Sequence, residues 1–330
     1  MTDPEIVRDE MNHTTTLGRS SLMVPRLGVG AMTWGEARGL ARFHPAKMAY
    51  GGAHGYEEEE RALEASLEAG VNLFDTAAMY SGGASERRLG ELAQGRDVLI
   101  ATKFPSGFRF RAEDFPSELE ASLARLGRHS IDLYQHHFPA RRVSIPKLMG
   151  RMADAVEAGK VKAVGVSNYS EEQMRQAHAA LAERGIPLAS NQVEYSLLHR
   201  QPESNGVLDA CRELEVTLIA YTPLAGGMLT GKYTAQNRPG GFFRRVLPRY
   251  RARALDAIQP VVEVLGKIGD RYSKTPSQVA LRWLIENPAV LPIPGAKNGK
   301  QATDNAGALS FSLSAEEVDA LDEATLGWRT

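Results

Sequence analysis

The chain has 330 residues, of which 43% are hydrophobic and 24% are charged, a composition typical of a globular protein with a large core. Its 39 lysines and arginines nearly balance its 40 aspartates and glutamates, so no overall charge attracts nucleic acid or an anionic membrane surface. The one cysteine, Cys211, excludes an intrachain disulfide framework and suits a reducing compartment, for which we expect the cytoplasm.

The N-terminal residues 1–13 predict a mobile tail, since they mix charged and polar residues without the apolar stretch of a signal peptide or membrane anchor. Residues 14–24 (TTTLGRSSLMV) predict a short β-hairpin ahead of the main fold. Nowhere does the chain approach the ~18 consecutive apolar residues that a membrane-spanning helix needs. We expect residues 14–330 to form a single domain.

Short apolar, β-branched runs recur along the rest of the chain, with amphipathic segments between them. Alternating strands and helices imply parallel strands, and eight strands are the number that closes a (β/α)8 TIM barrel, an α/β fold. A doubly wound open sheet is the alternative architecture. The runs that predict strands are residues 26–32, 71–77, 97–104, 131–138, 160–168, 187–195, 216–221 and 289–295. The segments whose apolar residues recur at spacings of three and four, as in helices, include 57–70, 117–127, 171–185 and 275–287.

Two long segments interrupt this alternation, residues 33–56 after the first predicted strand and residues 233–253 after the seventh. In a barrel, long loops at the carboxyl ends of strands carry the functional site. The second segment combines arginines with aromatic residues, and we expect a lid over a nucleotide or a solvated helix entry rather than a nucleic-acid surface, because the whole chain is nearly neutral. These residues are Arg238, Phe242, Phe243, Arg244, Arg245, Arg249, Tyr250, Arg251 and Arg253.

Four polar residues lie at the ends of three successive predicted strands: Asp75 and Tyr80 after the second, Lys103 at the third and His137 at the fourth. A tyrosine hydroxyl titrates near pH ~10, so it donates protons at neutral pH only beside a cation that stabilises its phenolate. Lys103 suits that role, Asp75 can keep the ammonium charged and oriented, and His137 can hydrogen-bond a substrate oxygen. The four residues together predict a centre that polarises a carbonyl group.

Residue chemistry alone leaves other interpretations open. A lysine inside a barrel can form a Schiff base with a carbonyl substrate, as in an aldolase, and Lys103 fits that chemistry too. The adjacent His136 and His137 lack the ligand spacing of a metal site, so we expect no metal. The glycine-rich segments at 28–33 and 226–233 each miss one residue of a nucleotide-binding motif from another fold, and neither supports that assignment.

Several segments, taken in order, closely resemble those of the aldo-keto reductases, over a span from about residue 15 to the C-terminus. The resemblance makes Tyr80 the general acid, Asp75 and Lys103 the pair that tunes it, and His137 the residue that orients the carbonyl. His136 occupies a position that is usually apolar in the family, which implies a structural role. The segments are FDTAAMY (74–80), ATKF (101–104), DLYQHHFP (132–139), GVSNY (165–169), NQVEYS (191–196), YTPLAGGMLTGKY (221–233) and IPGAKNGKQATDNAGAL (293–309).

The resemblance also implies a nicotinamide cofactor. It places Ser167, Asn168 and Gln192 around the carboxamide and Tyr221 against the ring, and these residue types suit an amide and a flat ring. The loop that ends at Lys232 would cover the pyrophosphate. All implied cofactor contacts are Gly30, Ala31, Met32, Ser167, Asn168, Gln192, Tyr221, Thr222, Pro223, Leu224, Gly226, Lys232, Gly295, Ala296, Lys297, Asn298, Gln301, Asp304 and Asn305.

The segment after the eighth predicted strand favours NADPH over NADH. It places a lysine at the start of a helix, whose first-turn N–H groups already attract an anion such as a ribose 2′-phosphate. By resemblance Lys297 and Asn298 would bind this phosphate, with Gln301 and Asn305 near the adenine. Many relatives have arginine at the position of Lys297, so here a point charge replaces a forked guanidinium.

The expected activity is the NADPH-dependent reduction of small aldehydes or ketones to alcohols, with a small carbonyl compound rather than nucleic acid or a membrane as partner. Trp34, Phe104 and Phe108 are candidate substrate contacts, with Tyr50, Tyr56 and Phe110 as further candidates at the mouth of the site. The loops resemble those of a subgroup from bacteria and plant chloroplasts, some of whose members reduce pyridoxal. The alternative function is a cofactor-binding regulatory protein, because potassium-channel β subunits resemble the same family.

Overall fold

The computed structural model describes residues 13–37, 54–105, 110–140, 143–240 and 247–329. Most of the predicted tail, the centre of the long segment 33–56, Phe108 and residues 241–246 lie outside these ranges. The predicted hairpin is confirmed: β1 (Thr14–Thr16) pairs antiparallel with β2 (Met23–Pro25).

Eight parallel strands form one sheet in the order in which they occur along the chain. The backbone N–H groups of Gly28 and Gly30 donate to the carbonyls of Pro292 and Pro294, so the first and last strands meet and the sheet closes. This closure confirms the predicted barrel and excludes the doubly wound open sheet. The strands are β3 (Val29–Gly30), β4 (Leu73–Asp75), β5 (Leu99–Phe104), β6 (Ile131–His136), β7 (Val161–Ser167), β8 (Leu188–Glu194), β9 (Thr217–Tyr221) and β10 (Val290–Pro292).

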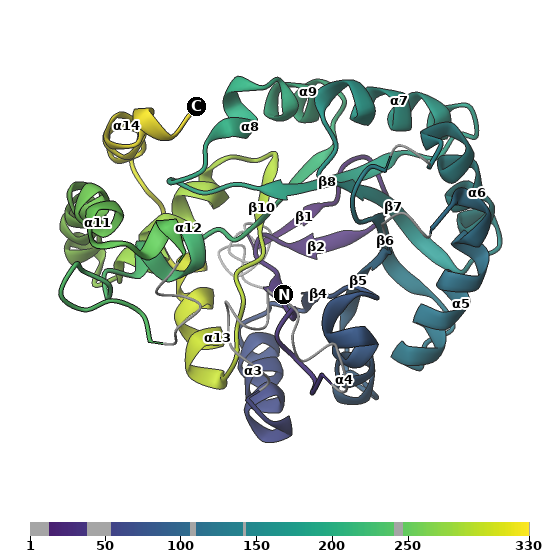
Figure 1. The fold of residues 1–330 in the computed structure, drawn as a ribbon, viewed down its shortest axis with the longest axis horizontal. Helices are drawn as coiled ribbons and strands as arrows, with labels where there is room; N and C mark the ends of the chain where they lie inside the picture. Colours follow the sequence, from purple (N-terminus) through teal and green to yellow (C-terminus); the bar gives the residue numbers. More distant parts are fainter. Residues whose placement is uncertain (1–12, 38–53, 106–109, 141–142, 241–246, 330) are drawn as a thin grey trace, which may run out of the picture.

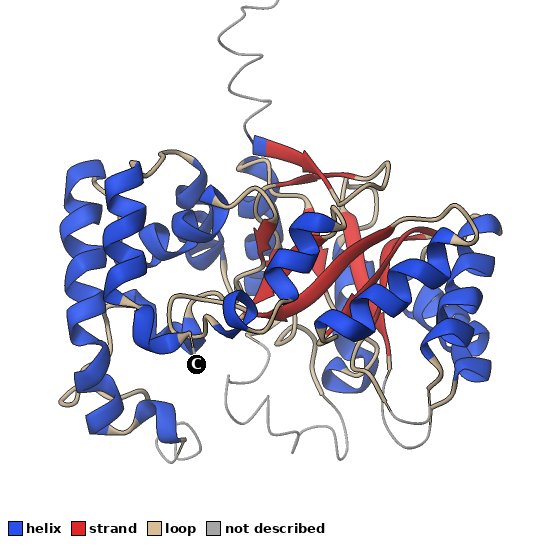
Figure 2. Cartoon of the chain, turned by 90° about the horizontal axis from the view of Figure 1, so that it is seen from above, coloured by secondary structure: helices blue, strands red, loops and turns tan. Residues whose placement is uncertain are grey.

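Helices surround the strands in Figure 1, and Figure 2 shows that they flank the strands on both sides while the β1–β2 hairpin lies at one end. Helices α5, α6 and α7 follow one another beside β5 to β8, and α3 packs closely against α13 near the point of closure. The α-helices are α3 (Tyr56–Glu68), α4 (Ala84–Leu92), α5 (Phe115–Leu126), α6 (Ile145–Glu157), α7 (Glu171–Ala182), α8 (Gln201–Ser204), α9 (Val207–Glu213), α11 (Ala252–Tyr272), α12 (Pro276–Glu286), α13 (Gly299–Ala306) and α14 (Ala315–Ala324). The short 3-10 turns are η2 (Tyr80–Gly83), η3 (Ala112–Asp114), η4 (Ala225–Thr230), η5 (Pro248–Tyr250), η6 (Gly307–Leu309) and η7 (Leu326–Trp328).

Local sequence signals set several of these boundaries. The hydroxyl groups of Ser170, Thr275 and Ser314 accept hydrogen bonds from the third backbone N–H of α7, α12 and α14, which satisfies a donor that has no partner inside the helix. Gly127 ends α5 with a left-handed φ of 62°, a conformation that costs glycine little. Within the part of the chain that the structure describes, no helix has the length and hydropathy to cross a membrane.

The loop after β3 is fixed at its base by a buried ion pair. Glu59 of α3 is 1% exposed, pairs with Arg88 of α4 and accepts the backbone N–H of Gly35 at 3.1 Å. Gly35 has a φ of 71°, and an added Cβ would lie 2.2 Å from the carbonyl oxygen of Ala84. Only glycine fits there without moving the backbone, because the chain passes so close to the Ala84 carbonyl.

Candidate functional site

Asp75, Lys103 and Tyr80 come together at the carboxyl ends of β4 and β5. The Lys103 ammonium donates to Asp75 Oδ1 at 2.5 Å and to the Thr76 carbonyl at 2.8 Å, and it lies 3.5 Å from the Tyr80 hydroxyl. Lys103 is 0% exposed and Asp75 3% exposed, so this ion pair is shielded from water. The geometry places a cation beside a phenol, as the sequence predicts.

The turn that carries Tyr80 has an unusual backbone. Ser81, Gly82 and Gly83 adopt left-handed φ angles of 55°, 65° and 80°, and serine rarely takes such an angle. The Ser81 hydroxyl is buried with no hydrogen-bond partner among the described residues. Strain of this kind persists where the surrounding structure enforces it, and here it lies directly after Tyr80.

Burial and charge act in opposite directions on the two ionisable groups. Burial raises the pKa of Tyr80, and the neighbouring Lys103 ammonium offsets this rise only in part. Burial by itself lowers the pKa of Lys103, but Asp75 and Tyr80 outweigh it and hold that pKa above its usual value. At neutral pH the phenol therefore keeps its proton and the lysine its charge. A charged lysine is a poor nucleophile, which disfavours the Schiff-base alternative.

The two adjacent histidines have different surroundings. His136 is 0% exposed on the outer side of β6, where its Nδ1 lies 2.7 Å from the Tyr169 hydroxyl, which fits a structural role. His137 is 7% exposed, and its ring packs edge-on against Tyr80 with the centroids 5.6 Å apart. Burial lowers the pKa of His136 to about 4, and burial, Lys103 and His136 lower that of His137 to about 2. Both imidazoles are neutral at physiological pH.

These depressed pKa values predict a loss of stability in acid. A histidine in the unfolded chain binds a proton near pH ~6.5, whereas the buried rings stay neutral, so the unfolded state gains protons first as the pH falls. Between pH 6 and 5 each ring should lower the free energy of unfolding by up to ~1.4 kcal/mol per pH unit. Urea unfolding of the wild type and of His136→Phe between pH 6 and 5 measures the contribution of the His136 ring to the pH dependence of the free energy of unfolding. We expect a shallower slope for the variant, and parallel curves would contradict the neutral state of His136.

The predicted nicotinamide contacts also gather in one place. Tyr221 donates its hydroxyl to Asn168 Oδ1 at 3.0 Å, and the Asn168 amide donates to the His137 carbonyl at 3.1 Å and to Ser167 Oγ at 3.0 Å. Asn168 is held in a left-handed conformation with a φ of 60°. Gln192 lies on the neighbouring strand, where its backbone carbonyl accepts the Ser167 hydroxyl at 2.8 Å. The side chains of Tyr221, Asn168 and Ser167 thus form a hydrogen-bonded chain beside His137, and the Gln192 backbone extends it.

The predicted pyrophosphate loop follows β9 directly and includes η4. Its backbone turns sharply, with positive φ angles at Thr222, Ala225, Gly226 and Gly227. The Tyr250 hydroxyl donates to the Gly226 carbonyl at 2.8 Å, so part of the arginine-rich segment packs against this loop. The Lys232 ammonium lies over the ring of Tyr233, 4.9 Å from its centroid. The described part of segment 238–253 is thus attached to the loop that the sequence places over the cofactor.

The predicted phosphate site surrounds the start of α13. Asn298 is the N-cap residue, since its Oδ1 accepts the backbone N–H of Gln301 at 3.0 Å, and Gln301 Oε1 in turn accepts the Lys297 N–H at 3.0 Å. Asn305 donates to the Gly295 carbonyl at 3.3 Å, and Asp304 pairs with Lys300. Gly30 lies beside this segment, since it forms a bridge with Gly295, whereas the Ala31 N–H donates to the Asp75 carbonyl at 2.8 Å.

Two of the predicted substrate contacts need correction. Side chains alternate across a strand, so Lys103 points into the barrel and Phe104 points outward, where it is 0% exposed and packs on Phe115 of α5. Trp34 is also 0% exposed, and its indole N–H donates to the Ala296 carbonyl at 2.7 Å. Neither ring is available to a substrate. Trp34 instead supports the backbone before α13.

The structure points to three residues near the site that sequence reasoning left unassigned. Met79 and Phe138 are 42% and 46% exposed and directly precede Tyr80 and follow His137. The Phe138 ring stacks on His137 with the centroids 4.7 Å apart. The only signal in the sequence was their position directly beside Tyr80 and His137; their exposure is visible only in the structure. The third residue is Gln135, which contacts Asp75 inside the barrel.

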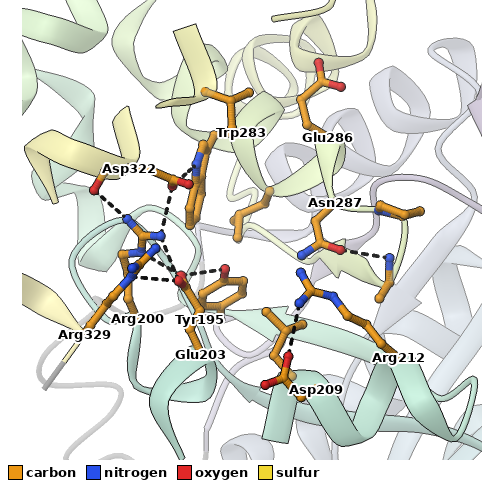
Figure 3. Close-up of a pocket in the computed structure, with 15 residues that line it drawn as sticks. Tyr195, Arg200, Glu203, Asp209, Arg212, Trp283, Glu286, Asn287, Asp322 and Arg329 are labelled. Carbon is orange, nitrogen blue, oxygen red and sulfur yellow. Dashed lines mark hydrogen bonds and ion pairs between the residues drawn. The ribbon is translucent and has the colours of Figure 1, made fainter. Parts of the chain in front are cut away.

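A separate cavity of about 670 Å³ lies between α8, α9, α12 and α14 (Figure 3). Its walls include Tyr195, Arg200 and Trp283 but none of the four predicted catalytic residues. The Arg200 side chain is 1% exposed and pairs with Glu203 at 2.6 Å and with Asp322 at 2.9 Å. Its backbone N–H donates to the Trp328 carbonyl at 2.8 Å. The buried charge of Arg200 is therefore satisfied internally, and this network attaches the C-terminal residues to α8.

Comparisons with known proteins agree with this geometry. Residues 26–325 match the model of the Aldo/keto reductase family. The chain is 35% identical over 324 residues to a chloroplastic pyridoxal reductase of Arabidopsis thaliana, covering 92% of this chain and 84% of the relative. It is 34% identical over 319 residues to the aldo-keto reductase yakc [NADP(+)] of Schizosaccharomyces pombe, covering 91% and 88%. The solved glycerol dehydrogenase of Gluconobacter oxydans superposes with a TM-score of 0.78 at 25% identity, covering 95% of each chain.

Proposed function

The chain belongs to the aldo/keto reductase family, and we propose that its one domain, residues 14–330, reduces small aldehydes or ketones to alcohols with NADPH. The observation that carries this proposal is the contact between the Lys103 ammonium, Asp75 and the Tyr80 hydroxyl in a water-shielded site. A protonated phenol beside a fixed cation is a proton donor whose conjugate base is stabilised in advance.

The proposed roles follow from the positions of the side chains. The bound cofactor supplies a hydride to the carbonyl carbon. Tyr80 donates its proton to the carbonyl oxygen, and Lys103 stabilises the phenolate that this transfer leaves. His137 is neutral, and its Nε2–H donates a hydrogen bond to the same oxygen. In this tautomer Nδ1 carries no proton. Nδ1 is buried and has no hydrogen-bond partner among the described residues. Asp75 keeps Lys103 charged and in place.

The residues beside Asp75, Tyr80, Lys103 and His137 suit a nicotinamide carboxamide. Gln192 Oε1 accepts no hydrogen bond from any described residue, whereas its Nε2 already donates to Asp75 at 2.9 Å and to Gln135 at 3.3 Å. This side chain can therefore act toward the cofactor as an acceptor for the carboxamide N–H2 group. Tyr221, at the end of β9, offers an aromatic face for the ring, as the family resemblance implies.

The preference for NADPH gives a direct prediction. The Lys297 charge and the N-terminal end of α13 should together attract the 2′-phosphate, so NADPH should bind at least about tenfold more tightly than NADH. Lys297→Glu should abolish this preference. Lys267→Glu, which makes the same charge change on an exposed face of α11, should preserve it.

Fluorescence titration of both cofactors against the three proteins measures these affinities. Equal binding of NADPH and NADH to the wild type, or an unchanged preference in Lys297→Glu, would contradict the assignment of this segment.

The exposed side chains of Met79 and Phe138 support substrates that carry an apolar substituent next to the carbonyl. Met79 and Phe138 flank the two residues that would contact the carbonyl oxygen, and both are accessible. The assay that tests the function mixes the protein with NADPH and 4-nitrobenzaldehyde and follows the loss of reduced cofactor. Turnover supports an enzyme. Cofactor binding without turnover on a panel of aldehydes, ketones and sugars would contradict the proposal.

A further inference from the structure

Three polar side chains from three strands, Asp75, Gln135 and Gln192, meet inside the barrel. Asp75 Oδ2 accepts hydrogen bonds from Gln192 Nε2 at 2.9 Å and from Gln135 Nε2 at 3.2 Å. Gln192 Nε2 also donates to Gln135 Oε1 at 3.3 Å. The exposed fractions are 3% for Asp75, 0% for Gln135 and 2% for Gln192, so water does not satisfy these groups. We call this arrangement the amide clamp.

The clamp uses both polar atoms of Gln135. Gln135 is also 0% exposed, so it is not accessible to a substrate or a cofactor and can act only through Asp75 and Gln192. A buried amide is costly unless it is hydrogen-bonded, and this clamp provides the bonds. The two carboxylate oxygens of Asp75 thereby have separate partners: Oδ2 faces the amides and Oδ1 faces Lys103.

The barrel wall has a gap that admits this side chain. Gln135 on β6 pairs with Gly165 on β7, which pairs with Ser190 on β8. A Cβ at Gly165 would lie 3.0 Å from Gln135 Cγ and 2.3 Å from the Ser190 hydroxyl oxygen. The missing side chain on β7 lets Gln135 cross the interior toward Asp75 and Gln192.

We propose that Gln135 is a positioning residue for the reduction, an inference that rests on the proposed function. Its amide holds Asp75 so that Oδ1 stays on the Lys103 ammonium. It also orients the Gln192 amide so that Oε1 faces outward as the acceptor for the carboxamide. Through Lys103 the same clamp sets the position of the cation beside the Tyr80 hydroxyl. The clamp thus links Gln192, the proposed cofactor contact, through Asp75 and Lys103 to Tyr80, the proposed proton donor.

The first test removes the amide. Gln135→Leu should lower the single-turnover rate of hydride transfer by about 10- to 100-fold, because small displacements of catalytic groups have effects of that size. NADPH affinity should fall less in Gln135→Leu than in Gln192→Leu, since Gln135 acts on the carboxamide contact only through Gln192. Gln192→Leu should instead weaken both the rate and NADPH binding. Thr102→Val is the matched control. Thr102 lies on the same strand as Lys103, and the substitution removes its 2.6 Å hydrogen bond to the buried carboxylate of Glu86.

The second test gives a signature that a structural role would not produce. Gln135→Glu puts a second carboxyl group about 3.2 Å from Asp75 Oδ2. Two carboxylates so close share a proton at low pH, when the new group can still donate to Asp75, and repel each other when both are ionised. The charged and titratable groups around this position are Asp75 on β4, Lys103 on β5, Tyr80 in η2 and His137 after β6.

The rate of Gln135→Glu relative to the wild type should therefore fall about tenfold or more between pH 6 and pH 9. The corresponding ratios for Gln135→Leu and Thr102→Val should not depend on pH.

A third measurement does not depend on activity. In the protein without cofactor, the 15N NMR signal of the Lys103 ammonium should be sharp and should shift or broaden in Gln135→Leu but not in Thr102→Val. An unchanged signal, together with a Gln135→Leu rate within threefold of the wild type, would overturn the role of Gln135. A wild type that binds NADPH but reduces no carbonyl would instead overturn the proposed function, and the NMR comparison would still decide whether Gln135 positions Lys103.

Discussion

Tyr80→Phe is expected to abolish carbonyl reduction and to leave NADPH binding nearly intact. The substitution removes only the hydroxyl, which lies 3.5 Å from the Lys103 ammonium, and keeps the ring that packs on His137. General acid catalysis typically contributes about 10²- to 10⁴-fold, equivalent to roughly 2.7–5.5 kcal/mol of transition-state stabilisation. The measurement is the single-turnover rate of hydride transfer, because product release can limit kcat in such enzymes.

The control for this variant is its cofactor affinity, which reports whether the site is still intact. His137→Ala provides a second comparison, since it should slow the reduction of a ketone more than that of a reactive aldehyde, which needs less help from a hydrogen bond. A Tyr80→Phe protein that keeps more than about a tenth of the wild-type single-turnover rate would refute the role of Tyr80 as the acid.

Lys103→Met should affect both catalysis and stability. The ammonium and the Asp75 carboxylate are 0% and 5% exposed in their side chains and lie 2.5 Å apart. Removing the cation leaves a buried carboxylate without its counter-charge, which typically costs about 3–5 kcal/mol of unfolding free energy. The rate should fall by about 100-fold or more, because the phenolate of Tyr80 loses the charge that stabilises it.

Double variants separate these two effects. Asp75→Asn combined with Lys103→Met removes both charges, so urea unfolding should show a recovery of at least half of the lost stability while the enzyme stays inactive. Tyr80→Phe combined with Lys103→Met should be scarcely slower than the slower single variant, because both residues act on the same proton transfer. Additive losses in rate would show that Lys103 acts in a step that does not involve Tyr80.

The strands were predictable because burial on both faces gives continuous apolar runs. Each of the eight strands lies within a predicted run, and Gly127 and Ser170 mark helix ends where the sequence places them. The proximity of four residues was also predictable from the strands, because the carboxyl ends of successive parallel strands lie at the same end of the barrel. These residues are Asp75, Tyr80, Lys103 and His137.

The errors and omissions have equally physical causes. The prediction that Phe104 contacts the substrate is wrong because side chains alternate along β5, so the ring next to Lys103 points outward onto Phe115. The position of Trp34 in a loop does not show whether its ring is exposed, and in the structure the ring is buried with its N–H on the Ala296 carbonyl. Gln135 went unassigned because its partners, Asp75 and Gln192, lie 60 and 57 residues away, and only the closed barrel brings them together.

The most direct test of the central claim follows the hydride itself. The wild-type protein is mixed in excess with 4-nitrobenzaldehyde and NADPH deuterated at the transferable position of C4, and both the rate and the product are analysed. We expect one equivalent of 4-nitrobenzyl alcohol that carries deuterium at the carbinol carbon, formed more slowly than with unlabelled NADPH. An alcohol without deuterium, or oxidation of the cofactor without alcohol, would contradict direct hydride transfer to the carbonyl in this site.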